Sequence, residues 1–216
     1  MKKIGLCICL LSFLFPCLIM GQNNKKAIEL LEKSAAVFQQ SNGIEASFLL
    51  KDGMSDPKSV HSFEGTLKSK SNKFVIDLPD MQTWFDGKTQ WSFLKSNQEV
   101  NITSPTSEEI AAVNPVALLR LYKNGYRPVY KGERTVDGNP VAEIELVADK
   151  AQLPWRKIFI RLDTRTNLPV SVLIRDKNGR NTDIHFLKIK QNLNFSDSVF
   201  VFKKEQFPNV EIIDLR

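Results

Sequence analysis

The spacing of apolar residues along this chain changes, close to its start, from a helical to a β-strand period. Between residues 25 and 40, apolar residues recur three or four positions apart, and polar or charged residues fill the positions between them. The apolar positions are Ile28, Leu31, Ala35 and Phe38. They would share one side of an α-helix, so the pattern predicts an amphipathic helix that ends just before Gly43, a residue suited to a left-handed cap.

Beyond this helix, apolar and polar residues alternate in short runs separated by turn residues. The expected strands are residues 45–50, 62–67, 73–78, 99–102, 141–147, 156–162, 170–175 and 183–189, with a further strand from residue 127. Turn signals such as Asp52-Gly53 and Ser71-Asn72 lie between them. This alternation predicts an antiparallel sheet with one apolar and one polar face.

Residues 83–93 contain the clearest hairpin, because Asp86-Gly87 is a strong turn signal between two alternating runs. Pairing across this turn places Trp84 and Trp91 on the same face of the sheet, and Phe93 joins them by alternation. Three large aromatic side chains make an extensive apolar surface. We expect them to point toward the concave face.

Two helix-start signals interrupt the strands. Thr106 and Glu109 are spaced as a capping box, and Asn114-Pro115 is suited to the N-cap and first position of a second helix. Residues 116–122 are apolar nearly all round, so this helix must be covered by other parts of the protein. It either completes an ordinary core or closes a cavity on the apolar face of the sheet, and the pattern alone favours the core.

Residues 1–21 have the pattern of a secretory signal peptide that is cleaved. Two lysines precede an apolar run that ends at the small residue Gly21, and polar chain begins at Gln22. A transmembrane anchor is one alternative, but the run is short for a spanning helix and Pro16 interrupts it. Lipidation of Cys17 is another alternative, which the large residues before this cysteine disfavour.

The composition excludes several classes of function. All three cysteines lie in the leader, so residues 22–216 are expected to form a single domain without disulfides. Removing the leader lowers the formal net charge from +6 to +4, and the scattered basic residues do not indicate a nucleic-acid-binding surface. His61 and His185 are isolated, and no nucleophile elbow, phosphate loop or zinc motif is present. We therefore expect neither an enzyme nor a bound cofactor or metal ion.

A set of short motifs occurs in a recognisable order along nearly the whole of residues 22–216. After the N-terminal helix come Gly43-Ile44-Glu45-Ala46-Ser47-Phe48, Phe63-Glu64-Gly65-Thr66-Leu67, Asp86-Gly87-Lys88-Thr89-Gln90-Trp91, the Asn114-Pro115 helix, Phe200-Val201-Phe202, and Pro208-Asn209-Val210-Glu211-Ile212-Ile213-Asp214. In order, spacing and leader, this chain resembles the periplasmic outer-membrane lipoprotein carrier family, the LolA-like proteins.

The resemblance implies a mainly β fold with some α-helix: an incomplete antiparallel β-barrel of about ten or eleven strands, with an N-terminal helix and a helical lid over the concave apolar face. Carried over by position, the lipid-cavity candidates are Phe48, Phe74, Ile76, Trp84, Trp91 and Phe93, and the lid candidates are Val116, Leu118, Leu119 and Leu121. The characterised carriers latch the lid with an arginine in an Arg-Pro-Asn run. Here the region carries Lys70, which could supply the charge but not the planar guanidinium.

The resemblance also implies a monomeric carrier in the periplasm of a Gram-negative bacterium. Such carriers take acylated lipoproteins or lipids from an inner-membrane ABC release complex, shield their acyl chains in the cavity, and deliver them to an acceptor at the outer membrane. Two alternatives remain open. One is a related sensor or regulatory module that binds a lipid or protein signal without transport, and the other is an enzyme on a similar scaffold.

We expect the exported protein to begin near Gln22, to carry no acyl group on Cys17, and to stay in solution without detergent. The apolar run is short for an anchor, and the residues before the cysteine are large. Intact-mass measurement of the periplasmic protein tests this expectation. Retention of residues 1–21, or an acylated Cys17, would contradict it.

Overall fold

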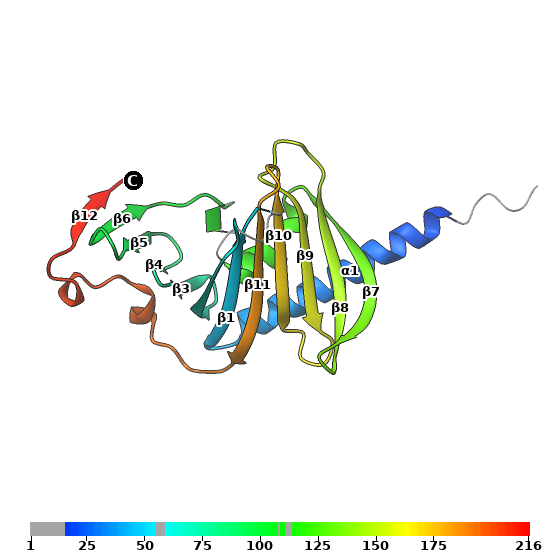
Figure 1. The fold of residues 1–216 in the computed structure, drawn as a ribbon. Helices are drawn as coiled ribbons and strands as arrows, with labels where there is room; N and C mark the ends of the chain where they lie inside the picture. Colours follow the sequence, from blue (N-terminus) through cyan, green and yellow to red (C-terminus); the bar gives the residue numbers. More distant parts are fainter. Residues whose placement is uncertain (1–15, 55–58, 108, 111–113) are drawn as a thin grey trace, which may run out of the picture.

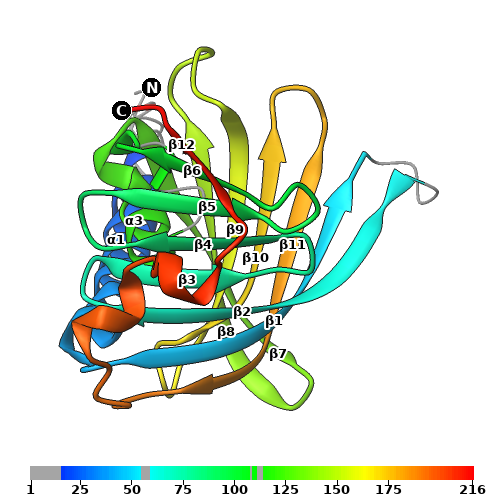
Figure 2. The same ribbon diagram turned by 90° about the vertical axis from the view of Figure 1, so that its left-hand side faces the viewer.

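The fold is built on one curved sheet of twelve strands that does not close into a barrel. The computed structural model describes residues 16–54, 59–107, 109–110 and 114–216. The strands follow the order β12-β6-β5-β4-β3-β2-β1-β11-β10-β9-β8-β7, and the two end strands are not paired with each other. Figures 1 and 2 show the resulting half-barrel, with the long helix α1 inside the curve of β7 to β10. This confirms the predicted incomplete barrel with an N-terminal helix.

Most of the described secondary-structure elements are strands. The strands are β1 (Ile44–Gly53), β2 (His61–Lys70), β3 (Lys73–Asp77), β4 (Met81–Phe85), β5 (Gln90–Leu94), β6 (Glu99–Thr103), β7 (Tyr126–Val136), β8 (Asn139–Ala148), β9 (Trp155–Asp163), β10 (Pro169–Asp176), β11 (Asn181–Lys190) and β12 (Glu211–Asp214). The helices are α1 (Pro16–Gln40) and α3 (Pro115–Leu119), with 3-10 turns η2 (Leu121–Lys123), η3 (Asp197–Phe200) and η4 (Lys204–Gln206).

The strand that sequence reasoning did not include is β12. It lies parallel to β6, whereas the other neighbouring strands described in the sheet are antiparallel. Its four residues are largely exposed and show no apolar alternation, so the pattern gave no sign of it. A long connection from β11 brings it to the edge of the sheet, and such a connection allows the parallel direction.

Helix α1 ends where the spacing predicted, at Gln40, but it begins at Pro16 instead of near residue 25. Its first residues therefore lie in the predicted leader, whose side chains fall outside the described part of the chain. The expected left-handed cap at Gly43 was wrong, because this glycine does not have a positive φ. Gly43 instead leaves room for a ring: a Cβ there would lie 2.7 Å from Cδ2 of Phe195.

Both helix-start signals are confirmed by the hydrogen bonds of their caps. The backbone N–H of Thr106 donates to the Glu109 carboxylate at 2.7 Å, and the N–H of Glu109 donates to the Thr106 hydroxyl at 3.3 Å, which completes the capping box. The Asn114 side chain accepts from the N–H of Ala117 at 3.3 Å, as an N-cap should. The second helix is shorter than expected, because α3 gives way to the 3-10 turn η2.

The three aromatic residues of the β4–β5 hairpin share one face of the sheet, as predicted, but this face is not the concave one. Trp84 pairs directly with Trp91, so both lie on one face together with Phe93. That face is the outer one, since Trp84 also pairs with Val75, whereas Phe85 pairs with Phe74 of the inner face. Our assignment of these three aromatics to the concave face was therefore wrong. Strand β4 is buried on both faces, so alternation could not distinguish them.

The C-terminal segment, residues 193–216, covers this outer aromatic surface. Phe207 packs on the rings of Trp84, Phe93 and Phe202 at centroid distances of 5.8, 4.9 and 5.3 Å. The buried members of the outer cluster are Val75, Trp84, Phe93, Val100, Phe200, Phe202 and Val210. The chain thus has an apolar core on each side of the sheet.

Replacing Phe200 with Ala should lower the free energy of unfolding by about 3–5 kcal/mol, because this side chain of the C-terminal segment is fully buried against the outer face of the sheet. Urea denaturation followed by tryptophan fluorescence measures the change. The matched control is Val201→Ala, since the adjacent Val201 is 37% exposed and should lose much less. Equal stability of the two variants would contradict the described packing.

Candidate functional site

An apolar cavity lies between the inner face of the sheet and α3. Its volume is about 120 Å³. The described lining residues are Phe48, Leu50, Leu67, Ile76, Leu78, Asn114, Leu118, Leu119, Pro169, Val172, Ile184 and Phe186. Asn114 is the one polar residue among them, so the cavity can take a hydrocarbon group and offers little to a charged one.

Strand pairing brings the lining residues together from distant parts of the chain. Strand β1 lies between β2 and β11, so Phe48 is opposite Gly65 on one side and Phe186 on the other. A Cβ on Gly65 would lie 2.6 Å from the Phe48 ring and 2.6 Å from Leu78, so a larger residue here would displace these two side chains. The absence of a side chain there lets the Phe48 ring lie across β2 toward the cavity.

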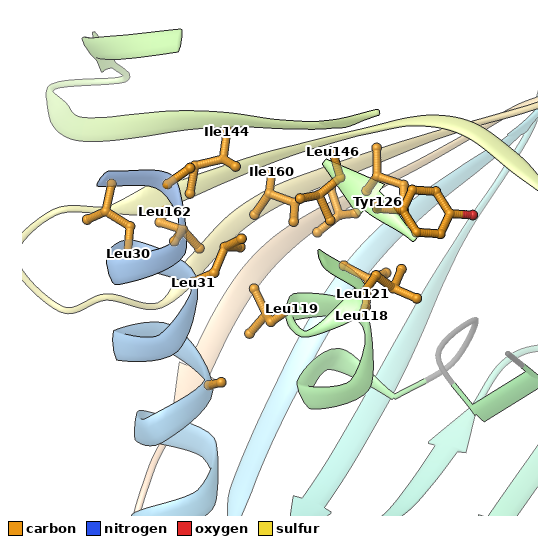
Figure 3. Packing of buried hydrophobic residues seen from close by; sticks show 14 of the residues in the cluster. Leu30, Leu31, Leu118, Leu119, Leu121, Tyr126, Ile144, Leu146, Ile160 and Leu162 are labelled. Atoms are coloured by element: carbon orange, nitrogen blue, oxygen red, sulfur yellow. The ribbon is translucent and has the colours of Figure 1, made fainter. Parts of the chain in front are cut away.

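The cover of the cavity also belongs to the main core. Leu118 and Leu119 line the cavity and are buried in the same cluster as Leu30 and Leu31 of α1. Figure 3 shows Leu119 on the side of the lid toward α1, and Leu118 and Leu121 on its other side, below the inner residues of β8 and β9. The two alternatives that the sequence left open, core and cavity cover, therefore both describe this helix. We call residues 114–123 the lid.

A carboxylate on α1 holds the end of the lid. One Glu32 oxygen lies 2.7 Å from Nζ of Lys123 and accepts a hydrogen bond from the Tyr122 hydroxyl, and the other lies 3.3 Å from Nη2 of Arg120. The hydrogen bonds from Lys123 and then Tyr122 lower the pKa of Glu32 to about 2. Glu32 is thus ionised at neutral pH and ties the lid to the N-terminal helix.

The predicted cavity residues divide into two groups. Phe48 and Ile76 line the cavity, whereas Phe74 is buried beside it on the inner face, against Phe85. The outer group, Trp84, Trp91 and Phe93, lies on the far side of the sheet from the cavity.

Of the lid candidates, Leu118 and Leu119 line the cavity, and Leu121 is buried in the core without lining it. The side chain of Val116 lies outside the described residues. Sequence reasoning missed Pro169, Val172, Ile184 and Phe186 as cavity residues, although alternation had placed most of them in strands. Their membership depends on the pairing of β1 with β11, which no local signal reveals.

The described residues meet neither the requirements of a metal site nor those of a membrane-spanning helix. Among them, no cluster of three or more His, Cys, Asp or Glu side chains is placed to hold a metal ion. His185 lies 3.0 Å from the Asp183 carboxylate on the sheet surface, and His61 is exposed. None of the helices described is both long and apolar enough to cross a membrane.

A family model described as outer membrane lipoprotein carrier protein LolA matches residues 18–179. The chain belongs to this family. The match runs from α1 through β10, so it includes the lid and most of the cavity lining. Among curated protein sequences, none matches the chain.

Solved structures share the LolA-like fold at low sequence identity. An uncharacterized conserved protein from Thermus thermophilus superposes with a TM-score of 0.58 at 9% identity, over 88% of this chain and 98% of its own. A DUF1329 family protein from Desulfovibrio piger gives a TM-score of 0.50 at 14% identity, over 86% of this chain and 99% of its own. Both likenesses concern the fold alone.

In this LolA-like chain, Lys70 does not lie at the lid. Its Nζ donates to the Phe195 carbonyl at 2.7 Å and to the Asp197 carboxylate at 3.0 Å, so it fastens the C-terminal segment to the outer face. Lys73 contacts the same carboxylate at 2.6 Å. The contact that ties the lid to α1 comes instead from Glu32.

Glu32→Gln should lower the free energy of unfolding by about 1 kcal/mol at pH 7, because partly exposed ion pairs are each worth roughly 0.2–1 kcal/mol. The folded pKa near 2 lies below the ordinary value of 4.5, so this stabilisation is complete above about pH 5 and is lost as the pH falls through 2. Urea denaturation of wild type and variant from pH 7 to 2 measures the difference, which should shrink with falling pH.

Glu29→Gln is the control for this series. Glu29 lies one turn earlier on α1, is about half exposed, and pairs with Lys33 of the same helix. Its replacement should change the free energy of unfolding less than the Glu32 change at pH 7. A Glu32 effect that stays constant down to pH 2 would show that the ionised carboxylate is not what holds the lid.

Proposed function

We propose that this protein carries acylated lipoproteins or lipids, with an acyl chain held between the lid and the inner face of the sheet. The observation that carries the proposal is the cavity itself, in which apolar side chains from the sheet and the lid surround a space with one polar neighbour among the described residues. A fatty acyl chain is a common biological ligand that requires an apolar lining. The membership of the chain in the lipoprotein carrier family supports the same function.

On this proposal, the small cavity corresponds to a closed position of the lid. A cavity of about 150 Å³ accommodates a group the size of benzene, so the 120 Å³ present here is too small for a whole acyl chain. Loading therefore requires the lid to move away from the sheet. Because Leu118 and Leu119 already occupy part of the inner face, an acyl chain would replace lid contacts with its own.

This exchange fits a carrier that must also release its cargo. Burying an acyl chain is worth about 0.8 kcal/mol per methylene, so full burial of a long chain in an empty preformed cavity would hold it too tightly for delivery. A lid that competes for the same surface reduces the net affinity. On this proposal the protein receives cargo from an inner-membrane ABC release complex in the periplasm and hands it to an acceptor at the outer membrane.

Filling the cavity should weaken acyl binding without unfolding the protein. Ile184→Trp places a large ring at the inner face, where we expect it to weaken binding of a fluorescent fatty acid at least tenfold and to lower stability by roughly 1–3 kcal/mol through overpacking. Fluorescence titration measures the affinity, and circular dichroism checks the fold.

Leu187→Trp is the matched control, because Leu187 belongs to the same strand and is 57% exposed outside the cavity. It should bind the probe as wild type does. Equal affinity of wild type and the folded Ile184→Trp protein would refute the cavity as the acyl site. Failure of wild type to bind the probe would refute it as well.

A further inference from the structure

A second pocket with different chemistry adjoins the acyl cavity. It has a volume of about 430 Å³ and lies between the C-terminal end of α1, the β2–β3 and β4–β5 turns, and the lid. Its described lining is mixed: it combines the apolar side chains of Phe85, Ile110 and Ala117 with the polar ones of Gln39, Ser71, Asn72, Asn114 and Arg120. Asn114 lines both spaces, so the pocket and the cavity meet at the start of α3.

Beside these apolar groups the pocket offers several hydrogen-bond donors, and its described lining contains no carboxylate. Three carboxamides and one guanidinium surround it. Nη2 of Arg120 contacts Gln39 at 3.0 Å and Glu32 at 3.3 Å. Its Nε is buried and has no hydrogen-bond partner in the described part of the chain. A buried N–H of this kind is costly to leave unpaired, and a small shift of the guanidinium toward a ligand oxygen would satisfy it.

We infer that this mixed pocket binds the head of the acylated ligand, with its polar groups facing the ester and amide carbonyls, while the acyl chain enters the adjoining cavity. The inference rests on the proposed function and adds the chemical class of head that the site takes. A lipid-modified peptide has both parts, since ester-linked chains join a glyceryl group that continues into peptide amides. Gln39 and Asn72 are exposed, so the pocket opens to solvent and leaves a path for the peptide.

The charges near the pocket favour a neutral head over a phosphate. The Arg120 guanidinium is already paired with the ionised Glu32, so it presents N–H donors with little uncompensated positive charge. A carboxamide can donate an N–H to an ester or amide carbonyl, and it can accept a hydrogen bond from an amide N–H. A phosphodiester would need an unpaired cation, and the described residues of the lining supply none.

The test compares three ligands whose acyl chains are all palmitoyl but whose heads differ: a fluorescent palmitate analogue, a dipalmitoylglyceryl-cysteine peptide, and dipalmitoyl phosphatidylglycerol. The variant is Arg120→Gln, which removes the buried donor. The matched control is Lys123→Gln, because Lys123 also pairs with Glu32 at 2.7 Å but does not line the pocket. Any change that comes from a loosened lid should appear in both variants.

We expect Arg120→Gln to weaken binding of the lipopeptide roughly 3- to 10-fold more than Lys123→Gln does, in line with the loss of one buried hydrogen bond. Palmitate binding should be the same in the two variants. Equal lipopeptide affinity in both variants would overturn the inference, and so would a larger Arg120 effect on the phospholipid than on the lipopeptide. Failure of wild type to bind palmitate would instead refute the acyl cavity, and with it the proposed function.

Discussion

An apolar inner face on a sheet that does not close must be covered by something other than the sheet, and this requirement shapes the rest of the molecule. The end strands β12 and β7 are unpaired with each other, so the sheet leaves its own interior open. Helix α1 covers the face of β8 to β10 and forms the main core there. The lid covers what remains and leaves the apolar cavity beneath it. The cavity is therefore a consequence of how the open sheet is capped.

The apolar side of the sheet also changes along its width. From β7 to β2 the inner positions are apolar, whereas in β5 and β6 the inner pairs are polar, as in Gln90 with Thr103 and Ser92 with Asn101. In those two strands the apolar pairs face outward, as in Trp91 with Ile102. The C-terminal segment covers them, and the apolar inner surface ends near β4. One sheet thus carries two cores, and Trp84 and Trp91 belong to the outer one, whereas Trp155 packs against the inner one.

Sequence reasoning succeeded where the signal is local and failed where it depends on pairing between distant segments. The Asn114 cap and the Asp86-Gly87 hairpin follow from short motifs, and both were predicted correctly. The orientation of Trp84 was not predictable, because its neighbour Phe85 is equally apolar and β4 is buried on both faces. The place of Ile184 in the cavity was hidden for another reason: it requires β11 to pair with β1, more than a hundred residues earlier in the chain.

The two kinds of contact that hold the lid differ in what it costs to break them, and this difference suits cargo-dependent opening. The pairs between Glu32 and the lid are partly exposed, so water replaces them at a small loss of free energy. Leu118 and Leu119 are buried, so lifting them from an empty cavity exposes apolar surface at about 25 cal/mol per Å². An acyl chain entering the same space removes most of that second penalty on the inner face. On the proposed function, cargo that binds the open conformation more tightly would therefore shift the lid toward opening, and the lid would close again when the cargo leaves.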